Sequence, residues 1–270
     1  MTRRLLSDLR RSALDRLTAH EFQFGDAHVR VHELWTMRPD LTRLVEVPTF
    51  VLVHGLGVSS RFFVPLADAL APHGRVLLFD LPGFDDLPRP RHRMSIVDFA
   101  DVVKRALDEL EVVDPVLVGH SMGSQVVTEI LAQHPTYSPA AMLIGPVVVA
   151  GERSLPQVIK RFVQASAHEP PGNTFTASTA YLRAGARWIR DTMPKVIAYP
   201  IEERLPLTKA RLVLVSGEND WVSPLAWREQ LASTVPGARV VTIPRAAHGV
   251  VHDGYRELAA ELLGLAGIGR

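Results

Sequence analysis

The 270-residue chain contains no cysteine. This absence excludes disulfide bonds, a thiolate nucleophile and cysteine metal ligands, and it leaves the redox compartment open. An excess of charge of one sign is also lacking, because 30 Lys and Arg residues offset 29 Asp and Glu residues for a formal net charge of +1. Nothing in this balance favours a nucleic acid or another polyanion as the partner.

Long apolar runs are lacking as well. No stretch approaches the ~20 apolar residues that a membrane-spanning helix needs, and residues 1–20 lack the apolar core of a secretion signal. We therefore expect a soluble, cytoplasmic protein without stable membrane insertion. With 47% hydrophobic and 22% charged residues, the chain has the composition of a globular protein with a substantial core.

The most informative stretch is residues 115–133, PVLVGHSMGSQVVTEILAQ. Its apolar start predicts a buried strand, and the three- and four-residue apolar spacing towards its end predicts a helix. Between the two, GHSMG at residues 119–123 must turn the chain sharply. Gly119 and Gly123 leave out side chains where backbone segments pass close to each other. Ser121 is then expected above the end of the sheet, at the positive end of the following helix.

Apolar strand patterns alternate with helical patterns along most of the chain, which predicts parallel strands joined by helical crossovers. The strands are expected at residues 48–53, 75–80, 115–118, 140–144, 211–216 and 239–243. The helices are expected at residues 61–70, 96–110 and 225–233, with a final helix reaching about residue 265.

The N-terminal region is predicted to differ from this alternation. Leucine spacing over residues 1–20 predicts an N-terminal helix packed on the domain edge, and a membrane-surface or partner-binding helix is the alternative. Residues 21–25 and 28–35 predict two strands of a hairpin, joined by Gly25-Asp26. Residues 89–93, RPRHR, form a small basic cluster, for which a solvated loop is the default interpretation and an anionic-substrate patch the alternative.

The G-x-S-x-G pattern in its strand–turn–helix context resembles the nucleophile elbow of the α/β-hydrolase family. The resemblance implies an α/β fold of the α/β-hydrolase type, with a mostly parallel central sheet flanked by helices and an inserted helical cap. We assign residues 1–146 and 208–270 to the hydrolase core. Residues 147–207, which are rich in proline and show no clear strand, are assigned to the cap or lid.

The resemblance extends to a complete set of catalytic residues in the family's order along the chain. A serine hydroxyl needs a base to remove its proton and an anion to orient that base. Ser121 matches the nucleophile, Asp220 lies in a loop that resembles the family's acid loop, and His248 follows the last strand as the family's histidine does. The alternatives are weaker: His252 falls within the final helix, and Glu218 lies too early in the acid loop.

The same resemblance implies an oxyanion hole made by two backbone N–H groups, those of Leu56 and Met122. His54 precedes this loop at a strand end, where we expect it to pack and to hydrogen-bond the loop. Residues 80–84 resemble the family's D-x-P-G-x-G segment, but Asp85-Asp86 depart from it, so we expect a reshaped or more acidic loop at the pocket.

The substrate pocket is predicted from aromatic and apolar residues near the triad and in the cap. The candidates are His120, Tyr181, Trp188 and Trp221, with Phe162, Phe175 and Met193 as further cap residues. Each of the aromatic residues taken alone is explained as readily by packing. As a group they imply a largely apolar, mid-sized substrate.

The resulting prediction is a serine hydrolase that cleaves a small-to-medium apolar carboxylic ester through an acyl-enzyme, with no metal and no organic cofactor. His20, His28 and His32 make no convincing metal-ligand group with carboxylates. Two alternatives remain open: a C–C bond hydrolase of ring-cleavage products, and a hydrolase-like ligand receptor with slow turnover. The sequence leaves acyl and alcohol specificity and the oligomeric state undetermined.

Overall fold

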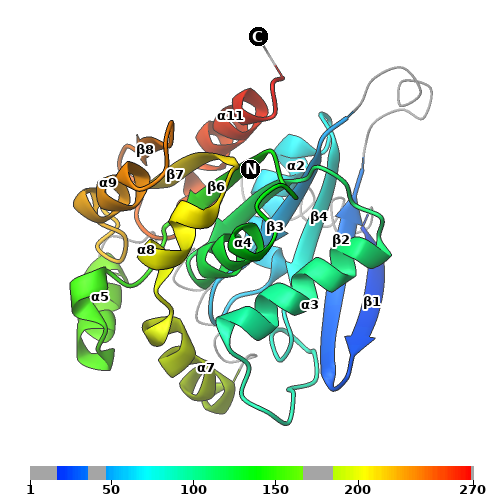
Figure 1. Ribbon diagram of the computed structural model, residues 1–270, viewed down its shortest axis with the longest axis horizontal. Helices are drawn as coiled ribbons and strands as arrows, with labels where there is room; N and C mark the ends of the chain where they lie inside the picture. Colours follow the sequence, from blue (N-terminus) through cyan, green and yellow to red (C-terminus); the bar gives the residue numbers. More distant parts are fainter. Residues whose placement is uncertain (1–16, 36–46, 167–184, 269–270) are drawn as a thin grey trace, which may run out of the picture.

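The computed structural model describes residues 17–35, 47–166 and 185–268, and its centre is an eight-stranded sheet (Figure 1). The strand order is β1-β2-β4-β3-β5-β6-β7-β8. The strands are β1 (Thr18–Phe24), β2 (Ala27–Leu34), β3 (Thr49–Val53), β4 (Arg75–Asp80), β5 (Val116–His120), β6 (Ala140–Ile144), β7 (Arg211–Gly217) and β8 (Arg239–Ile243). Strands β3 to β8 pair in parallel, whereas β1 with β2 and β2 with β4 pair antiparallel. The predicted, mostly parallel sheet is therefore confirmed.

Helices cover both faces of the sheet. They are η1 (Ser60–Phe63), α2 (Val64–Leu70), α3 (Ile96–Glu109), α4 (Met122–Gln133), η2 (Ala150–Glu152), α5 (Leu155–Ser166), α7 (Ala186–Ala198), α8 (Ile201–Arg204), η3 (Leu205–Leu207), α9 (Leu225–Ser233), α10 (Val250–Asp253) and α11 (Tyr255–Leu265). Side chains alternate along each strand, so Val51 and Val53 pack towards α3 and α4, while Phe50 and Leu52 pack towards α2 and α11. Burial on both faces explains why the central strands are continuous apolar runs.

Local sequence signals account for the start of α3. The side chain of Ser95 accepts a hydrogen bond from the backbone N–H of Asp98 at 3.2 Å, and the Asp98 carboxylate accepts one from the backbone N–H of Ser95 at 2.7 Å. This reciprocal arrangement is a capping box, which satisfies N–H groups that the first helical turn leaves unpaired. Ile96, Phe99 and Val103 then lie on the buried face of the helix, as their spacing predicts.

The N-terminal prediction needs one correction. Residues 1–16 of the expected helix lie outside the described residues, but Thr18–His20 belong to strand β1, where a helix was predicted. These three residues pair with β2, where Thr18 lies opposite Glu33. A side-chain contact supports the pairing, because His20 Nε2 lies 3.0 Å from a Glu33 carboxylate oxygen. The hairpin turn at Gly25-Asp26 is confirmed, because Phe24 pairs with Ala27 across it.

Between β6 and β7, the regular secondary structure of the described residues is helical, and we refer to residues 147–207 as the cap. Its division from the core as a separate unit stays a prediction. Polar contacts join it to the core at Glu129, a residue of α4 that is 2% exposed. The Glu129 carboxylate accepts a hydrogen bond from the Tyr199 hydroxyl at 2.8 Å and is paired with the Arg204 guanidinium at 2.8 Å. The end of the cap is therefore fixed to α4 by a paired buried charge.

Candidate active site

Ser121 occupies the turn from β5 to α4 in a backbone conformation with φ 57° and ψ −120°. A positive φ is costly for a residue with a side chain, so the turn is strained and must be held by its surroundings. Two backbone hydrogen bonds hold it: Ser121 N–H donates to the Ile144 carbonyl at 2.8 Å, and Ser124 N–H donates to the Ser121 carbonyl at 2.9 Å. The serine is thereby fixed at the carboxyl end of the parallel strands, the edge where open α/β sheets bind ligands.

The two glycines of this turn are sites of close backbone approach. A Cβ atom at Gly119 would lie 2.2 Å from the Gly123 carbonyl oxygen, and one at Gly123 would lie 2.1 Å from the Val53 carbonyl oxygen. Neither position has room for a methyl group, because both clashes involve backbone atoms. The sequence-based explanation of these two glycines is confirmed.

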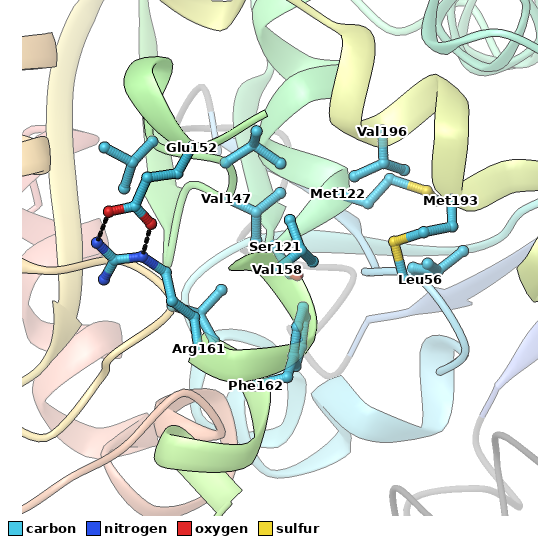
Figure 2. Close-up of a pocket in the computed structure, with 13 residues that line it drawn as sticks. Leu56, Ser121, Met122, Val147, Glu152, Val158, Arg161, Phe162, Met193 and Val196 are labelled. Atoms are coloured by element: carbon cyan, nitrogen blue, oxygen red, sulfur yellow. Dashed lines mark hydrogen bonds and ion pairs between the residues drawn. The ribbon is translucent and has the colours of Figure 1, made fainter. Parts of the chain in front are cut away.

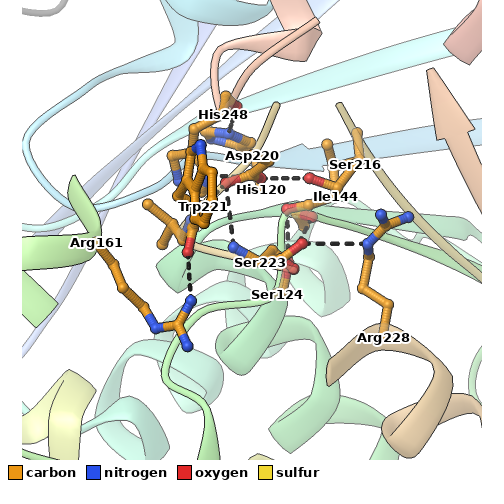
Figure 3. A network of polar contacts seen from close by, with 12 residues as sticks. His120, Ser124, Ile144, Arg161, Ser216, Asp220, Trp221, Ser223, Arg228 and His248 are labelled. Carbon is orange, nitrogen blue, oxygen red and sulfur yellow. Dashed lines mark hydrogen bonds and ion pairs between the residues drawn. The ribbon is translucent and has the colours of Figure 1, made fainter. Parts of the chain in front are cut away.

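His248 and Asp220 lie in the loops after β8 and β7, and they meet although neither loop is regular. The His248 Nδ1 atom lies 2.9 Å from Oδ2 of Asp220, and both side chains are buried (Figure 3). The same carboxylate accepts hydrogen bonds from the Ser216 hydroxyl and from the backbone N–H groups of Val222 and Ser223, the last two at 2.9 and 3.1 Å. A carboxylate with this many donors is held in one orientation.

These contacts keep Asp220 ionised. Burial alone would raise the pKa of its carboxyl, but the charge of and the hydrogen bond from His248, with further donation by Ser216 and Ser223, lower the pKa to about 2. An ionised Asp220 accepts the Nδ1 proton of the imidazole, which leaves the Nε2 atom of His248 as the basic nitrogen.

The elbow and the His–Asp pair border the same end of β6. Ser121 bonds to the carbonyl of Ile144, and the next residue, Gly145, is packed against the pair. A Cβ atom at Gly145 would lie 3.0 Å from the His248 ring and 3.2 Å from the Asp220 carboxylate. The structure thus brings Ser121, Asp220 and His248, which are far apart in the sequence, to one region of the sheet edge.

His120 lies beneath this region rather than in a pocket. Its Nε2 atom lies 3.0 Å from the backbone carbonyl oxygen of His248, and the two imidazole centroids are 5.0 Å apart. Burial, reinforced by the charge of His248, lowers the pKa of His120 to about 3, so the ring is neutral at pH 7 and donates to that carbonyl. Phe62 and Phe63 pack around the same ring.

The loop after β3 is held next to the serine by His54. Its Nδ1 donates to the Gly55 carbonyl at 2.7 Å, and its Nε2 accepts from the Leu81 N–H at 3.0 Å. Burial lowers the pKa of this imidazole, which favours the neutral form that these two bonds require. Gly55 lies so close to Ser121 that a Cβ atom would be 2.8 Å from the serine Cβ. His54 therefore fixes the loop that carries Leu56, as expected of a structural residue.

A cavity of about 430 Å³, counting space open to solvent, lies over Ser121 (Figure 2). It is lined by Leu56, Ser121, Met122, Val147, Val148, Val149, Glu152, Val158, Arg161, Phe162, Met193, Val196 and Val222. Ten of these thirteen residues are apolar. The cavity wall comes from both the core and the cap, and its composition suits an apolar ligand of modest size.

Of the predicted pocket residues, Phe162 and Met193 line this cavity, whereas His120, Trp188 and Trp221 do not. Trp188 is instead buried beside Gly83, where a Cβ atom would lie 2.6 Å from its ring. It joins the cap to the core because large aromatic surface is most stable when packed.

Trp221 is 47% exposed, and its backbone carbonyl accepts a hydrogen bond from Arg161 of the cap. Tyr181 and Phe175 lie outside the described residues. The correction has one physical cause: sequence identifies apolar side chains but does not indicate which of them face the cavity and which fill the interior or lie at the surface.

Three polar or charged residues of this region that were not predicted from the sequence are Ser216, Glu152 and Arg161. Ser216, which donates to Asp220, has a weak signal as the polar residue at the end of an otherwise apolar strand. Glu152 and Arg161 are the charged residues of the cavity wall, and nothing in their spacing of nine residues indicates that they pair there. In the part of the chain that the structure describes, no group of three or more His, Asp or Glu side chains is placed to hold a metal ion.

None of the helices among the described residues has the length and apolar character to cross a bilayer.

The loop at Asp85 and Asp86 is not an isolated acidic patch, because its carboxylates pair with arginines. Asp86 lies 2.6 Å from the Arg30 guanidinium and Asp85 lies 3.6 Å from that of Arg61.

Comparisons with known proteins agree with this architecture. The sequence model of the alpha/beta hydrolase family matches residues 50–261. A pimeloyl-(acyl-carrier protein) methyl ester esterase from Xanthomonas campestris pv. campestris (strain B100) is 27% identical over 243 residues, 80% of this chain and 93% of that protein. The esterase of the same name from Pseudoalteromonas atlantica is 35% identical over 101 residues, 36% of this chain and 36% of that protein. The chain spans only about a third of the length of several curated relatives that it matches, between 27% and 36%.

Solved structures show the same fold at low sequence identity. An enol-lactonase from Burkholderia xenovorans LB400 superimposes with a TM-score of 0.76 and 18% identity, covering 92% of this chain and all of that one. A bacterial membrane phospholipase A superimposes with a TM-score of 0.77 and 20% identity, covering 97% of this chain and 91% of that one.

Proposed function

Because the chain belongs to the alpha/beta hydrolase family, we propose that it is a serine hydrolase that cleaves the carboxylic ester of a small-to-medium apolar substrate. One observation carries the proposal: a buried His248–Asp220 pair lies at the same sheet edge as the strained Ser121, and Ser121 faces an apolar cavity. A serine, a base and an orienting carboxylate are the parts that acyl transfer needs.

The reaction follows from the roles of these three residues. The hydroxyl oxygen of Ser121 attacks the ester carbonyl carbon while Nε2 of His248 takes the hydroxyl proton. Asp220 holds the Nδ1 proton, so it fixes the tautomer of His248 and offsets the charge of the imidazolium. Collapse of the tetrahedral intermediate expels the alcohol, which receives the proton from Nε2. A water molecule, deprotonated by the same nitrogen, then attacks the acyl-enzyme and releases the carboxylic acid.

The negative charge of the tetrahedral intermediate needs hydrogen-bond donors. We assign this role to the backbone N–H groups of Leu56 and Met122, two residues that line the cavity next to Ser121. Met122 is the first residue of α4, where the helix dipole and free N–H groups favour an anion. The packing of Gly55 against Ser121 supports the assignment of Leu56, because it keeps that loop within reach of the serine.

The cavity supports an apolar acyl or alcohol group of modest length. Ten of the thirteen residues that line it are apolar, and such a lining binds apolar groups. The names of two relatives denote methyl ester hydrolysis, which supports carboxylic-ester chemistry for this chain but does not identify its substrate.

The test is hydrolysis of p-nitrophenyl esters with acyl chains of increasing length. We expect Ser121→Ala to lower kcat by at least ~10³-fold, because removal of the nucleophile leaves only the binding and oxyanion contributions. Ser233→Ala is the matched control, since this exposed hydroxyl of α9 bonds only the Gln230 carbonyl in the described residues. A fluorophosphonate should label the wild type on Ser121 by mass spectrometry and leave Ser121→Ala unlabelled. Unchanged turnover in Ser121→Ala would overturn the proposal.

A further inference from the structure

Glu152 and Arg161 are the two ionisable residues among those that line the cavity. Glu152 belongs to η2 and Arg161 to α5, so both come from the cap. Figure 2 shows the pair at one end of the cavity, while Met193 and Leu56 lie at the other end, beyond Ser121. The cavity therefore has a polar end and an apolar end, with the proposed nucleophile between them.

The pair is tightly formed. Nε and one terminal nitrogen of Arg161 donate to the two carboxylate oxygens of Glu152, the latter bond being 2.6 Å long. The other terminal nitrogen donates to the backbone carbonyl of Trp221 at 2.8 Å (Figure 3). The pair thus has a structural role, because it joins the cap to the loop that carries Asp220.

That structural role uses only part of the hydrogen-bonding capacity. A guanidinium group has five N–H donors and a carboxylate accepts about four hydrogen bonds. Among the described residues, Arg161 uses three donors and Glu152 accepts two bonds, so donors and acceptors remain at the wall of the cavity.

The charge of the pair decides what kind of group fits. The hydrogen bond from Arg161 lowers the pKa of Glu152, so both groups are ionised near pH 7 and their charges cancel. A substrate carboxylate next to Arg161 would also lie beside the negative charge of Glu152, and the residues that line the cavity include no second cation. The charge of Lys160 acts on Glu152 from outside this lining. A hydroxyl or an amide, in contrast, donates to Glu152 and accepts from Arg161 without adding charge.

We propose that the Glu152–Arg161 pair is a specificity subsite for an uncharged hydroxyl or amide group, which the ester substrate carries on its apolar portion away from the scissile bond. The inference rests on the proposed ester hydrolysis, and it adds that the preferred substrates are bifunctional. In these substrates the ester lies at Ser121, the apolar portion lies along Val147 and Val158, and the polar group reaches the pair.

The cap provides a matched control pair with the same chemistry. Arg153 pairs with Glu202 at 2.7 Å and donates to the backbone carbonyls of Ile197 and Tyr199, but neither Arg153 nor Glu202 lines the cavity. The side chains of the two pairs have similar exposure, 24% and 22% in this pair against 20% for Arg161 and 30% for Glu152. A change in this second pair should therefore reproduce the effects on cap stability without affecting the proposed subsite.

The experiment compares esters that differ only at the group remote from the ester. One series has p-nitrophenyl esters of equal chain length with a terminal methyl, hydroxyl, primary amide or carboxylate on the acyl chain. The second series has alkyl esters with the same terminal groups on the alcohol, and their hydrolysis is measured by titration of the released acid. In at least one series we expect kcat/KM for the substrate with a terminal hydroxyl or amide to exceed kcat/KM for the substrate with a terminal methyl by about tenfold. This is the effect of one hydrogen bond to a charged group. The carboxylate ester should be the poorest.

Arg161→Met and Glu152→Gln should reduce this selectivity ratio towards one, whereas Arg153→Met should leave the ratio unchanged even where it lowers the melting temperature. The inference would be overturned if the wild type had equal kcat/KM values for substrates with a terminal methyl, hydroxyl or amide group in both series. A preference for the carboxylate ester would overturn it as well. Hydrolysis of the substrates with a terminal methyl group would still support the ester-hydrolase proposal. Failure of the subsite inference is therefore distinguishable from failure of the proposed function.

Discussion

The Nε2 atom of His120 lies 3.0 Å from the backbone carbonyl oxygen of His248, although the two residues are 128 positions apart. His120 directly precedes the proposed nucleophile, Ser121, and His248 is the proposed base. Since the buried His120 ring is neutral, its N–H donates to that carbonyl without bringing a charge beneath the site. The turn that positions the serine and the loop that positions the base are therefore joined by one hydrogen bond.

Replacement of His120 by leucine should lower kcat by about tenfold and change KM less, because the loop of His248 loses its anchor while the cavity wall is untouched. His120→Gln retains an N–H donor and should recover part of the loss. Ester hydrolysis at several substrate concentrations measures both constants, and His92→Leu, at an exposed histidine, is the control. Equal kcat values for the leucine, glutamine and wild-type proteins would contradict the role of this bond.

The two buried neutral histidines should make the fold sensitive to mild acid. Burial lowers the pKa of His54 and lowers that of His120 to about 3, both from an ordinary value of 6.5. Between these values the unfolded chain binds more protons than the folded one, so this stabilisation is complete above about pH 6.5 and is lost as the pH falls towards the folded values. Urea unfolding should show a free energy of unfolding that falls between pH 7 and 5.5, above the range in which most carboxylates titrate. His120→Gln should show a smaller fall over the same range, and an identical fall would contradict the assignment.

Much of this fold is predictable from sequence because strand burial and helix amphipathicity are local patterns. The strands at residues 75–80, 140–144 and 239–243 and the helix at 225–233 have the predicted bounds. Strand β5 extends to His120, two residues further than predicted, because Gly119 and His120 interrupt the apolar pattern before the pairing with β6 ends. The final helix is two segments, α10 and α11, with Gly254 between them.

The site is less predictable, because its contacts connect loops that no short-range pattern relates. Motif order along the chain indicates Ser121, Asp220 and His248. The structure pairs His248 with Asp220 and places this pair at the sheet edge where Ser121 lies. The motif contains no information on Ser216 or on the Glu152–Arg161 pair, since a hydrogen bond between distant loops depends on tertiary packing. The orientation of Trp188 into the interior is unpredictable for the same reason.

The contacts of Asp220 predict a graded response to substitution. Asp220→Asn would place an amide beside Nδ1 of His248 and favour the wrong tautomer, so kcat should fall by roughly 10³–10⁴-fold. Ser216→Ala removes only one donor to the carboxylate and leaves the two backbone N–H bonds, so kcat/KM should fall by less than about tenfold. Ester hydrolysis at pH 7 checks both, and a loss in Ser216→Ala as large as that in Asp220→Asn would contradict this ordering.

The same contacts contribute to stability in acid. The pKa of Asp220 is lowered from 3.8 to about 2, so its contribution is present above about pH 4 and is lost as the pH falls towards 2. The Ser216 hydroxyl helps to lower this pKa, so Ser216→Ala should raise the pKa of Asp220. Acid unfolding of the variant should then begin at a higher pH than that of the wild type. Acid unfolding of the wild type and the variant, followed by circular dichroism, measures the difference. Coincident acid transitions would show that the hydroxyl has no influence on the carboxylate.

The turn that carries Ser121 should not tolerate a side chain at Gly123. Gly123→Ala would place a methyl group 2.1 Å from the Val53 carbonyl oxygen, a backbone atom that cannot move without disturbing β3. We expect a loss of several kcal/mol in the free energy of unfolding, or a turn displaced enough to abolish activity.

Gly264→Ala is the matched control, because this exposed residue of α11 has nothing within 4 Å of the added Cβ atom. Alanine there should stabilise the helix by roughly 0.5–1 kcal/mol. Thermal and urea unfolding of both variants give the comparison, and a Gly123→Ala protein as stable and active as the wild type would show that the elbow does not require the close approach of its helix to β3.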